Sequence, residues 1–143
     1  IVVSGVPLSA HTGRILTGHD GWGGGTVADG FATELRTIVA TLKEKRIRNV
    51  TWLTTDIHVA RFFSYDPDNN GTADFYEFVS GPLAAITGNL DVLDDTFHPT
   101  ILYEENGFYN FGVVKVNGKS GALTAEIRDQ AGKVHHALTL KAR

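Results

Sequence analysis

The pattern of apolar and polar positions over the first 55 residues predicts a strand, a helix and a second strand. Residues 1–6 are rich in β-branched apolar side chains, as in a buried strand. Residues 27–46 carry apolar side chains at helical spacing, after a capping box formed by Thr26 and Asp29. Residues 50–55 are a second strand, so the segment is a βαβ unit with two parallel strands. The apolar helix face comprises Phe31, Leu35, Ile38, Val39 and Leu42.

The last third of the chain alternates apolar and polar residues in three segments, 109–116, 123–128 and 134–141. The turn sequence Asn117-Gly118 and the polar residues 129–132 separate these segments, which is typical of an antiparallel meander. Residues 75–79 and 101–103 are two further expected strands. The fold class is therefore α/β (α+β), with an N-terminal βαβ unit followed by a C-terminal antiparallel meander. A glycine-rich loop over residues 7–25 is long enough to suggest a functional role.

Composition bounds the possible functions. The 143 residues are 42% hydrophobic, which is enough for one buried core, and residues 1–143 are interpreted as part of a single domain. Thirteen basic against 16 acidic residues give a net charge of −3, so nucleic-acid binding is not expected. No apolar stretch approaches the roughly 20 residues of a transmembrane helix. The chain has no cysteine and no methionine and opens inside an expected strand, so we expect an N-terminal half that precedes it.

The sequence Asp56-Ile57-His58 follows the second expected strand directly. Two positions apart on an extended strand end, a carboxylate and an imidazole point the same way and offer one oxygen and one nitrogen ligand. Ligands of parallel sheets bind beyond the carboxyl ends of the strands, which is where this pair lies. The pair is a candidate metal site, and the alternative is a capping aspartate beside a loop histidine.

Residues 66–77 match the pattern of a calcium-binding loop at every specified position. An EF-hand is excluded because Gly81-Pro82 would halt the outgoing helix and no second loop is present. Two interpretations remain open: a lone calcium loop, or a polar turn rich in Asp, Asn and Gly for conformational reasons. The candidate calcium ligands are Asp66, Asp68, Asn70, Thr72, Asp74 and Glu77.

The adjacent pair His135 and His136 resembles a chelating site. Adjacent residues of a strand face opposite sides, however, and His136 shares the apolar face of Leu138 and Leu140. Both histidines are therefore predicted to be structural.

Several spaced segments, taken in order, resemble the C-terminal half of the alkaline phosphatase D (PhoD-like) family of metallophosphoesterases. The resemblance covers essentially the whole chain, and its specificity comes from the order of the segments. The matching segments are residues 3–9, 19–22, 49–60 (which contain Asp56-Ile57-His58), 65–67, 77–83, 93–97, 110–112 and 121–124.

The resemblance implies a metallophosphoesterase-like β-sandwich flanked by helices, with a polynuclear site of iron and calcium that hydrolyses phosphate mono- or diesters. Asp56 would be a metal ligand, and His58 a ligand, a phosphate contact or the acid that protonates the leaving alkoxide. Asp20 would be a carboxylate close to the site. A secreted or periplasmic location is also implied.

Two departures from the family pattern limit what this chain is expected to do alone. Thr55 stands where the family has a glycine, so backbone approach to the metal could be altered and a degenerate domain is kept as an alternative. The family's other metal ligands belong to the N-terminal half, and one Asp and one His cannot complete the coordination of two or three metals. The expected partners are that N-terminal half and a phosphate ester, and the chain by itself is predicted to be inactive. The alternative function is a calcium-binding module built on residues 66–77.

Overall fold

The structure is a computed structural model that describes residues 1–12, 21–23, 31–90 and 92–143. Within these ranges the chain forms one helix and eight strands. In chain order they are β1 (Val2–Val3), α1 (Ala32–Glu44), β2 (Val50–Thr54), β3 (Ala60–Tyr65), β4 (Phe75–Val79), β5 (Pro99–Glu105), β6 (Asn110–Val116), β7 (Leu123–Asp129) and β8 (Val134–Leu140).

The strands form two sheets. The larger one has the order β1-β2-β4-β3-β5, in which β1, β2 and β4 are parallel and β3 runs antiparallel to both of its neighbours, β4 and β5. The smaller one is an antiparallel meander in the order β6-β7-β8. These findings confirm the predicted parallel βαβ unit, the meander and an α/β, sheet-rich fold class.

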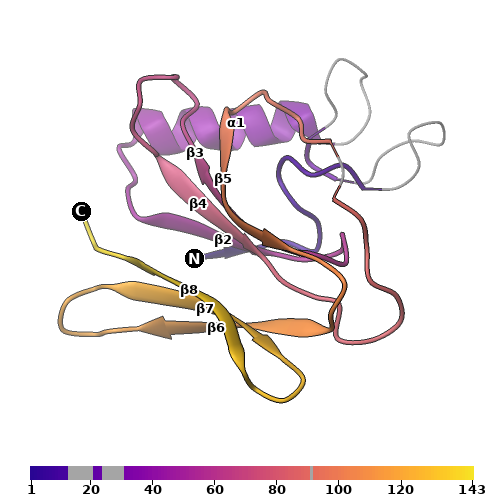
Figure 1. Ribbon diagram of the computed structural model, residues 1–143. Coiled ribbons are helices and arrows are strands. Elements are labelled where there is room, and N and C mark those ends of the chain that lie inside the picture. The colour runs from indigo at the N-terminus through magenta and orange to yellow at the C-terminus, as the bar shows by residue number, and fades with distance from the viewer. Residues whose placement is uncertain (13–20, 24–30, 91) are drawn as a thin grey trace.

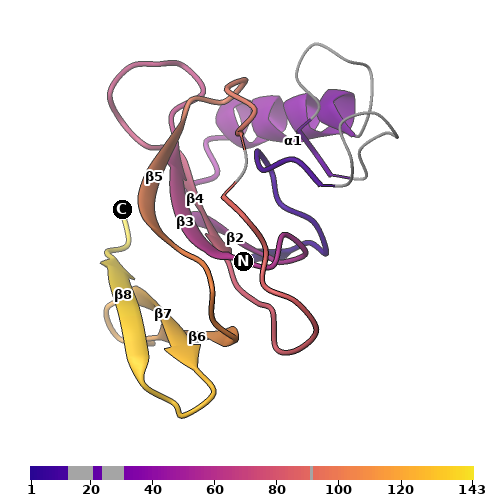
Figure 2. The same ribbon diagram turned by 45° about the vertical axis from the view of Figure 1, so that its right-hand side comes forward.

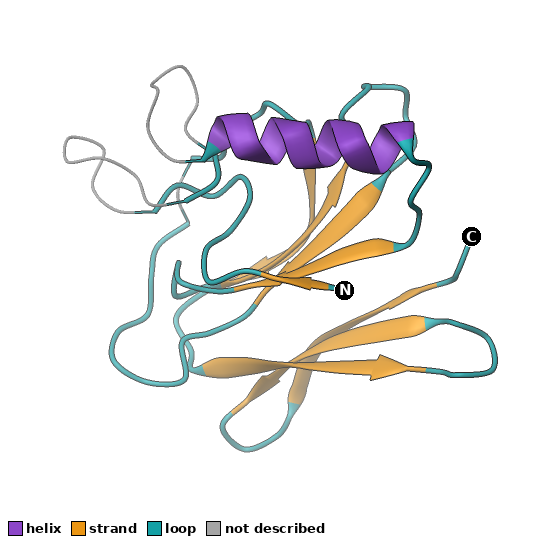
Figure 3. Cartoon of the chain, turned by 180° about the vertical axis from the view of Figure 1, so that it is seen from behind, coloured by secondary structure: helices purple, strands orange, loops and turns teal. Residues whose placement is uncertain are grey.

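The helix and the two sheets lie in three layers (Figures 1 and 3). Helix α1 covers one face of the larger sheet, and its buried Leu35 and Val39 belong to the same apolar cluster as Trp52, Tyr65 and Phe75. The smaller sheet packs near the opposite face, and the turned view of Figure 2 shows it as a separate layer. The core between the sheets consists of Ala60, Phe62, Phe78, Ala125 and Ile127.

Helix α1 is observed where the apolar periodicity predicts it, with Leu35 and Val39 buried and Ile38 and Leu42 packed against the same core. Its first described turn follows Phe31, which makes no side-chain cap. The predicted capping box of Thr26 and Asp29 lies outside the described residues. The helix ends with the C-cap at Lys45, close to the predicted end at residue 46.

Two strand predictions differ from the structure. The strand expected over residues 1–6 is only Val2–Val3, because the Ser4 hydroxyl bonds to the Val6 carbonyl at 2.8 Å and starts a local turn. Strand β3 was not predicted from the sequence. It contains Arg61, which is 2% exposed and pairs with Glu104 of the neighbouring strand at 3.1 Å. The pairing with β5 thus supplies a partner for a charged side chain in a buried strand.

No described helix is both long enough and apolar enough to cross a membrane.

Candidate functional site

Asp56 and His58 leave the larger sheet in the connection between β2 and β3. Their backbone φ angles are 85° and 59°, so both residues are in the left-handed region. The premise of an extended strand end is therefore wrong: β2 ends at Thr54, and the chain turns tightly through these positions. Asp and His adopt such angles more readily than most side chains, and five other non-glycine residues of the described part also have a positive φ. Strained backbone of this kind is enriched at functional sites. Asp56 is exposed and His58 is half-buried.

This turn lies at the carboxyl edge of the parallel strands and is fixed from two sides. The Thr55 hydroxyl donates a 2.9 Å hydrogen bond to the Ser80 carbonyl, just beyond the end of β4. The Gly88 amide donates a 2.8 Å hydrogen bond to the His58 carbonyl. A Cβ at Gly88 would lie 2.3 Å from the Ile57 carbonyl oxygen, so only glycine allows the loop to approach this closely.

Thr55 causes no backbone strain at the position where the resemblance expects a glycine. Its φ is not among the positive values of the described residues, unlike those of Asp56 and His58. The side chain also makes a hydrogen bond that a glycine could not make. The substitution is therefore compatible with the observed turn.

A buried carboxylate makes hydrogen bonds next to this edge of the sheet. Glu77 on β4 is 0% exposed, and its Oε1 accepts hydrogen bonds from the Leu8 amide at 2.9 Å and the Thr54 hydroxyl at 2.7 Å. Its Oε2 accepts a 2.5 Å hydrogen bond from the Tyr65 hydroxyl. Burial raises the pKa of Glu77, although its three donors oppose this effect, and burial together with the neighbouring carboxylate raises the pKa of Tyr65.

The donor set at the turn fits a metal ion in part. An aspartate oxygen suits hard cations such as calcium and iron, and an imidazole nitrogen suits iron. Among the described residues, however, no group of three or more His, Cys, Asp or Glu side chains is placed to hold a metal. Asp20, the third candidate carboxylate, lies outside the described residues.

A family model described as PhoD-like phosphatase matches residues 1–127 of the 143. The chain belongs to this family. The resemblance seen in the sequence is therefore confirmed, and membership supports a phosphatase-type hydrolase acting on phosphate esters. Neither a curated protein nor a solved structure matches the chain.

In this PhoD-like phosphatase chain, the calcium-loop residues have other contacts. The Asp66 carboxylate accepts hydrogen bonds from the backbone amides of Asn70 at 3.1 Å and Gly71 at 2.6 Å, which closes a tight turn. Asp68 and Asp74 both pair with Lys43 of helix α1. These contacts favour the interpretation as a polar turn.

Glu77 is the residue that would complete a calcium loop, and it faces elsewhere. It lies on the same face of β4 as Phe75 and Val79, which belong to the core under helix α1. Turning toward the loop would break three buried hydrogen bonds. The calcium-module alternative is therefore not favoured by the structure.

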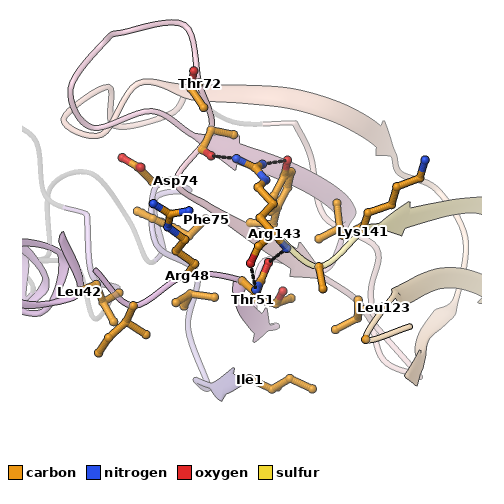
Figure 4. A pocket seen from close by; sticks show the side chains of 18 of the residues that line it. Ile1, Leu42, Arg48, Thr51, Thr72, Asp74, Phe75, Leu123, Lys141 and Arg143 are labelled. Carbon is orange, nitrogen blue, oxygen red and sulfur yellow. Dashed lines mark hydrogen bonds between the residues drawn. The ribbon is translucent and has the colours of Figure 1, made fainter. Parts of the chain in front are cut away.

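A large cavity lies at the opposite end of the strands from the turn of Asp56. Its volume is about 830 Å³, and it is lined by the starts of β2 and β4 and by the last residues of the chain. Figure 4 shows Arg48, Lys141 and Arg143 in this cavity, beside apolar side chains. Among the described residues that line it, Asp74 is the one with a side-chain carboxylate, and it pairs with Lys43 at 2.7 Å. The described lining therefore offers no imidazole and no unpaired acidic side chain for metal-assisted hydrolysis.

Both histidines of the adjacent pair have structural contacts, as predicted. His136 stacks on Tyr103 with ring centroids 4.3 Å apart, in the core between the sheets. His135 faces the other way and stacks on Phe108 at 4.3 Å. The alternation of a β-strand was the signal that identified this arrangement.

Proposed function

We propose that this chain contributes to the metal site of a phosphatase or phosphodiesterase that hydrolyses phosphate mono- or diesters. Family membership supports the phosphate-ester class. The observation that carries the assignment to residues is the left-handed turn of Asp56 and His58 at the carboxyl edge of β1, β2 and β4. Ligands of parallel sheets bind at such an edge.

Asp56 is the proposed metal ligand, and His58 is a ligand or a phosphate contact. The proposed metals are iron and calcium, which match an oxygen and a nitrogen donor. When bound, such ions neutralise phosphoryl charge and lower the pKa of a coordinated water. The remaining donors come from polypeptide other than the described residues, and Asp20 is one candidate.

The residues of the chain have distinct proposed tasks. Asp56 is exposed, so its carboxylate can reach an ion at the edge of the sheet. His58 is half-buried, and its imidazole can hold the proton that the leaving alkoxide takes up. The Gly88 amide donates a hydrogen bond to the His58 carbonyl, which keeps the turn in one conformation.

The test uses the protein expressed from its complete reading frame. We expect Asp56→Asn and His58→Asn to lower the hydrolysis of bis(p-nitrophenyl) phosphate at least about 100-fold, the scale of general acid–base and ligand effects. Elemental analysis should show metal loss in Asp56→Asn. Glu44→Gln is the control, because Glu44 is an exposed carboxylate at the far end of helix α1.

Parent-level turnover and metal content in Asp56→Asn would exclude the proposed ligand. Comparison of p-nitrophenyl phosphate with the diester would then assign the mono- or diesterase class.

A further inference from the structure

Glu77 receives hydrogen bonds from three segments, two of them strands of the larger sheet. Leu8 follows β1, Thr54 is the last residue of β2, and Tyr65 is the last residue of β3. All of these groups are buried, with exposed fractions of 4% or less. A single carboxylate on β4 therefore links the last residues of β2 and β3 to the segment that follows β1.

A carboxylate at this position is costly, because the neighbouring positions on the same face, Phe75 and Val79, are core residues. Transfer of a charged group from water into a protein interior is unfavourable unless hydrogen bonds compensate for the lost hydration. A hydrophobic side chain of similar size would fill the space without that cost. Some property other than packing should therefore account for Glu77.

The location of the Glu77 contacts indicates what this carboxylate does. Glu77 lies opposite Trp52 in the register of β2 and β4, so its carboxylate reaches forward to Thr54 at the carboxyl end of β2. The next residues are Thr55 and Asp56. The second contact on the same oxygen, from the Leu8 amide, fixes the segment that leaves the carboxyl end of β1.

We propose that Glu77 is a positioning residue, whose carboxylate fixes the end of β2 against the segment after β1 and thereby sets where Asp56 and His58 leave the sheet. This inference rests on the proposed function, because it assigns the buried network to the same metal edge. Thr54 transmits the effect, since it is both bonded to Glu77 and two residues before Asp56. The Tyr65 hydroxyl donates a hydrogen bond to the other carboxylate oxygen and keeps the Glu77 side chain in one rotamer.

The deciding variant is Thr54→Val, which removes one hydroxyl from the network and keeps the shape of the side chain. Using the protein expressed from its complete reading frame, we expect metal affinity to fall about tenfold, the lower range for groups that orient metal ligands indirectly. The measurement is the metal retained after dialysis against graded chelator concentrations, together with kcat and KM for the diester. Thr54→Ala removes the same hydroxyl and serves if Thr54→Val does not fold.

Two conservative variants are expected to keep the metal affinity of the parent. Thr54→Ser keeps the hydroxyl and is expected to restore the parent's metal affinity. Glu77→Gln is expected to retain it as well, because the amide oxygen can accept from Leu8 and Thr54 while the Tyr65 hydroxyl accepts from the amide nitrogen.

The variant Val39→Ala distinguishes an effect on the position of the metal ligands from a general loss of stability. Val39 is 4% exposed in the same core but contacts it from helix α1, so its truncation lowers the thermal midpoint without touching the network. Its metal affinity should equal that of the parent. Parent-level affinity in Thr54→Val would overturn the positioning role and leave the proposed function standing. A parent protein that neither retains metal nor hydrolyses the diester would overturn both.

Discussion

The imidazole Nε2 of His135 lies 3.1 Å from the Oδ2 of Asp129, across the turn that joins β7 to β8. Its Nδ1 lies 3.1 Å from a carboxylate oxygen of Glu105 at the end of β5. The hydrogen bonds to Asp129 and Glu105 raise the pKa of His135 above its ordinary value of 6.5. The histidine therefore ties the smaller sheet to the edge of the larger one while it is protonated.

The His135 contacts predict a pH-dependent stability. The histidine bonds lower the pKa of Asp129, and a bond from Tyr103 followed by one from His135 lowers that of Glu105. Because the folded pKa of His135 is raised, its contribution is complete below pH 6.5 and is lost as the pH rises through the folded value. Because the carboxylate pKa values are lowered, their contribution is complete above pH 4.5 and is lost on acidification.

We therefore expect the thermal midpoint difference between the parent and His135→Gln to be largest from pH 4.5 to 6.5 and to shrink on either side. Thermal unfolding across pH measures this difference. A constant difference would show that only the stacking of His135 on Phe108 matters. His98→Gln serves as the control, because His98 is 42% exposed and its ion pair with Asp95 is longer, at 3.8 Å.

Tyr65 and Tyr103 offer a comparison of the same bond in different surroundings. Each hydroxyl donates a 2.5 Å hydrogen bond to a glutamate, but Tyr65 is 0% exposed while Tyr103 is half-buried. We expect Tyr65→Phe to lower the free energy of unfolding by about 1–3 kcal/mol, because buried Glu77 loses a donor that water cannot replace. Tyr103→Phe should cost less than about 1 kcal/mol, because water can replace the lost donor. Urea denaturation would measure both, and equal losses would contradict the assigned role of burial.

Gly88 and Gly118 offer a second matched pair. Neither has a positive φ, but an added Cβ at Gly88 would lie 2.3 Å from the Ile57 carbonyl oxygen, whereas one at Gly118 would meet nothing within 4 Å. We expect Gly88→Ala to cost about 1–3 kcal/mol of unfolding free energy through overpacking. It should also lower phosphate-ester hydrolysis, because the turn of His58 must shift.

Gly118→Ala should change the free energy of unfolding by no more than about 0.5 kcal/mol and leave hydrolysis unchanged. Wild-type hydrolysis in a folded Gly88→Ala variant would show that the His58 turn tolerates displacement.

Features that depend on interactions within one element could be predicted from the sequence, and features that depend on long-range contacts could not. The amphipathic face of α1 and the alternation in β6 to β8 were readable from the chain, because they depend on spacing within one element. Strand β3 was missed because Arg61 is satisfied by Glu104, which is 43 positions away. Glu77 was interpreted as a loop ligand because a sequence pattern does not show which side of a strand lies under a helix.

The same distinction between local and long-range interactions applies to the candidate site. The family, the parallel βαβ unit and the location of Asp56 and His58 just past a strand could be predicted from the amino-acid sequence, since these depend on residue order and local periodicity. The left-handed turn, the hydrogen bond from Gly88 to it and the bonds of the Glu77 carboxylate to Leu8, Thr54 and Tyr65 became visible only in the folded chain. Those contacts link residues 12 to 69 positions apart, and such pairings exist only once the sheet has assembled.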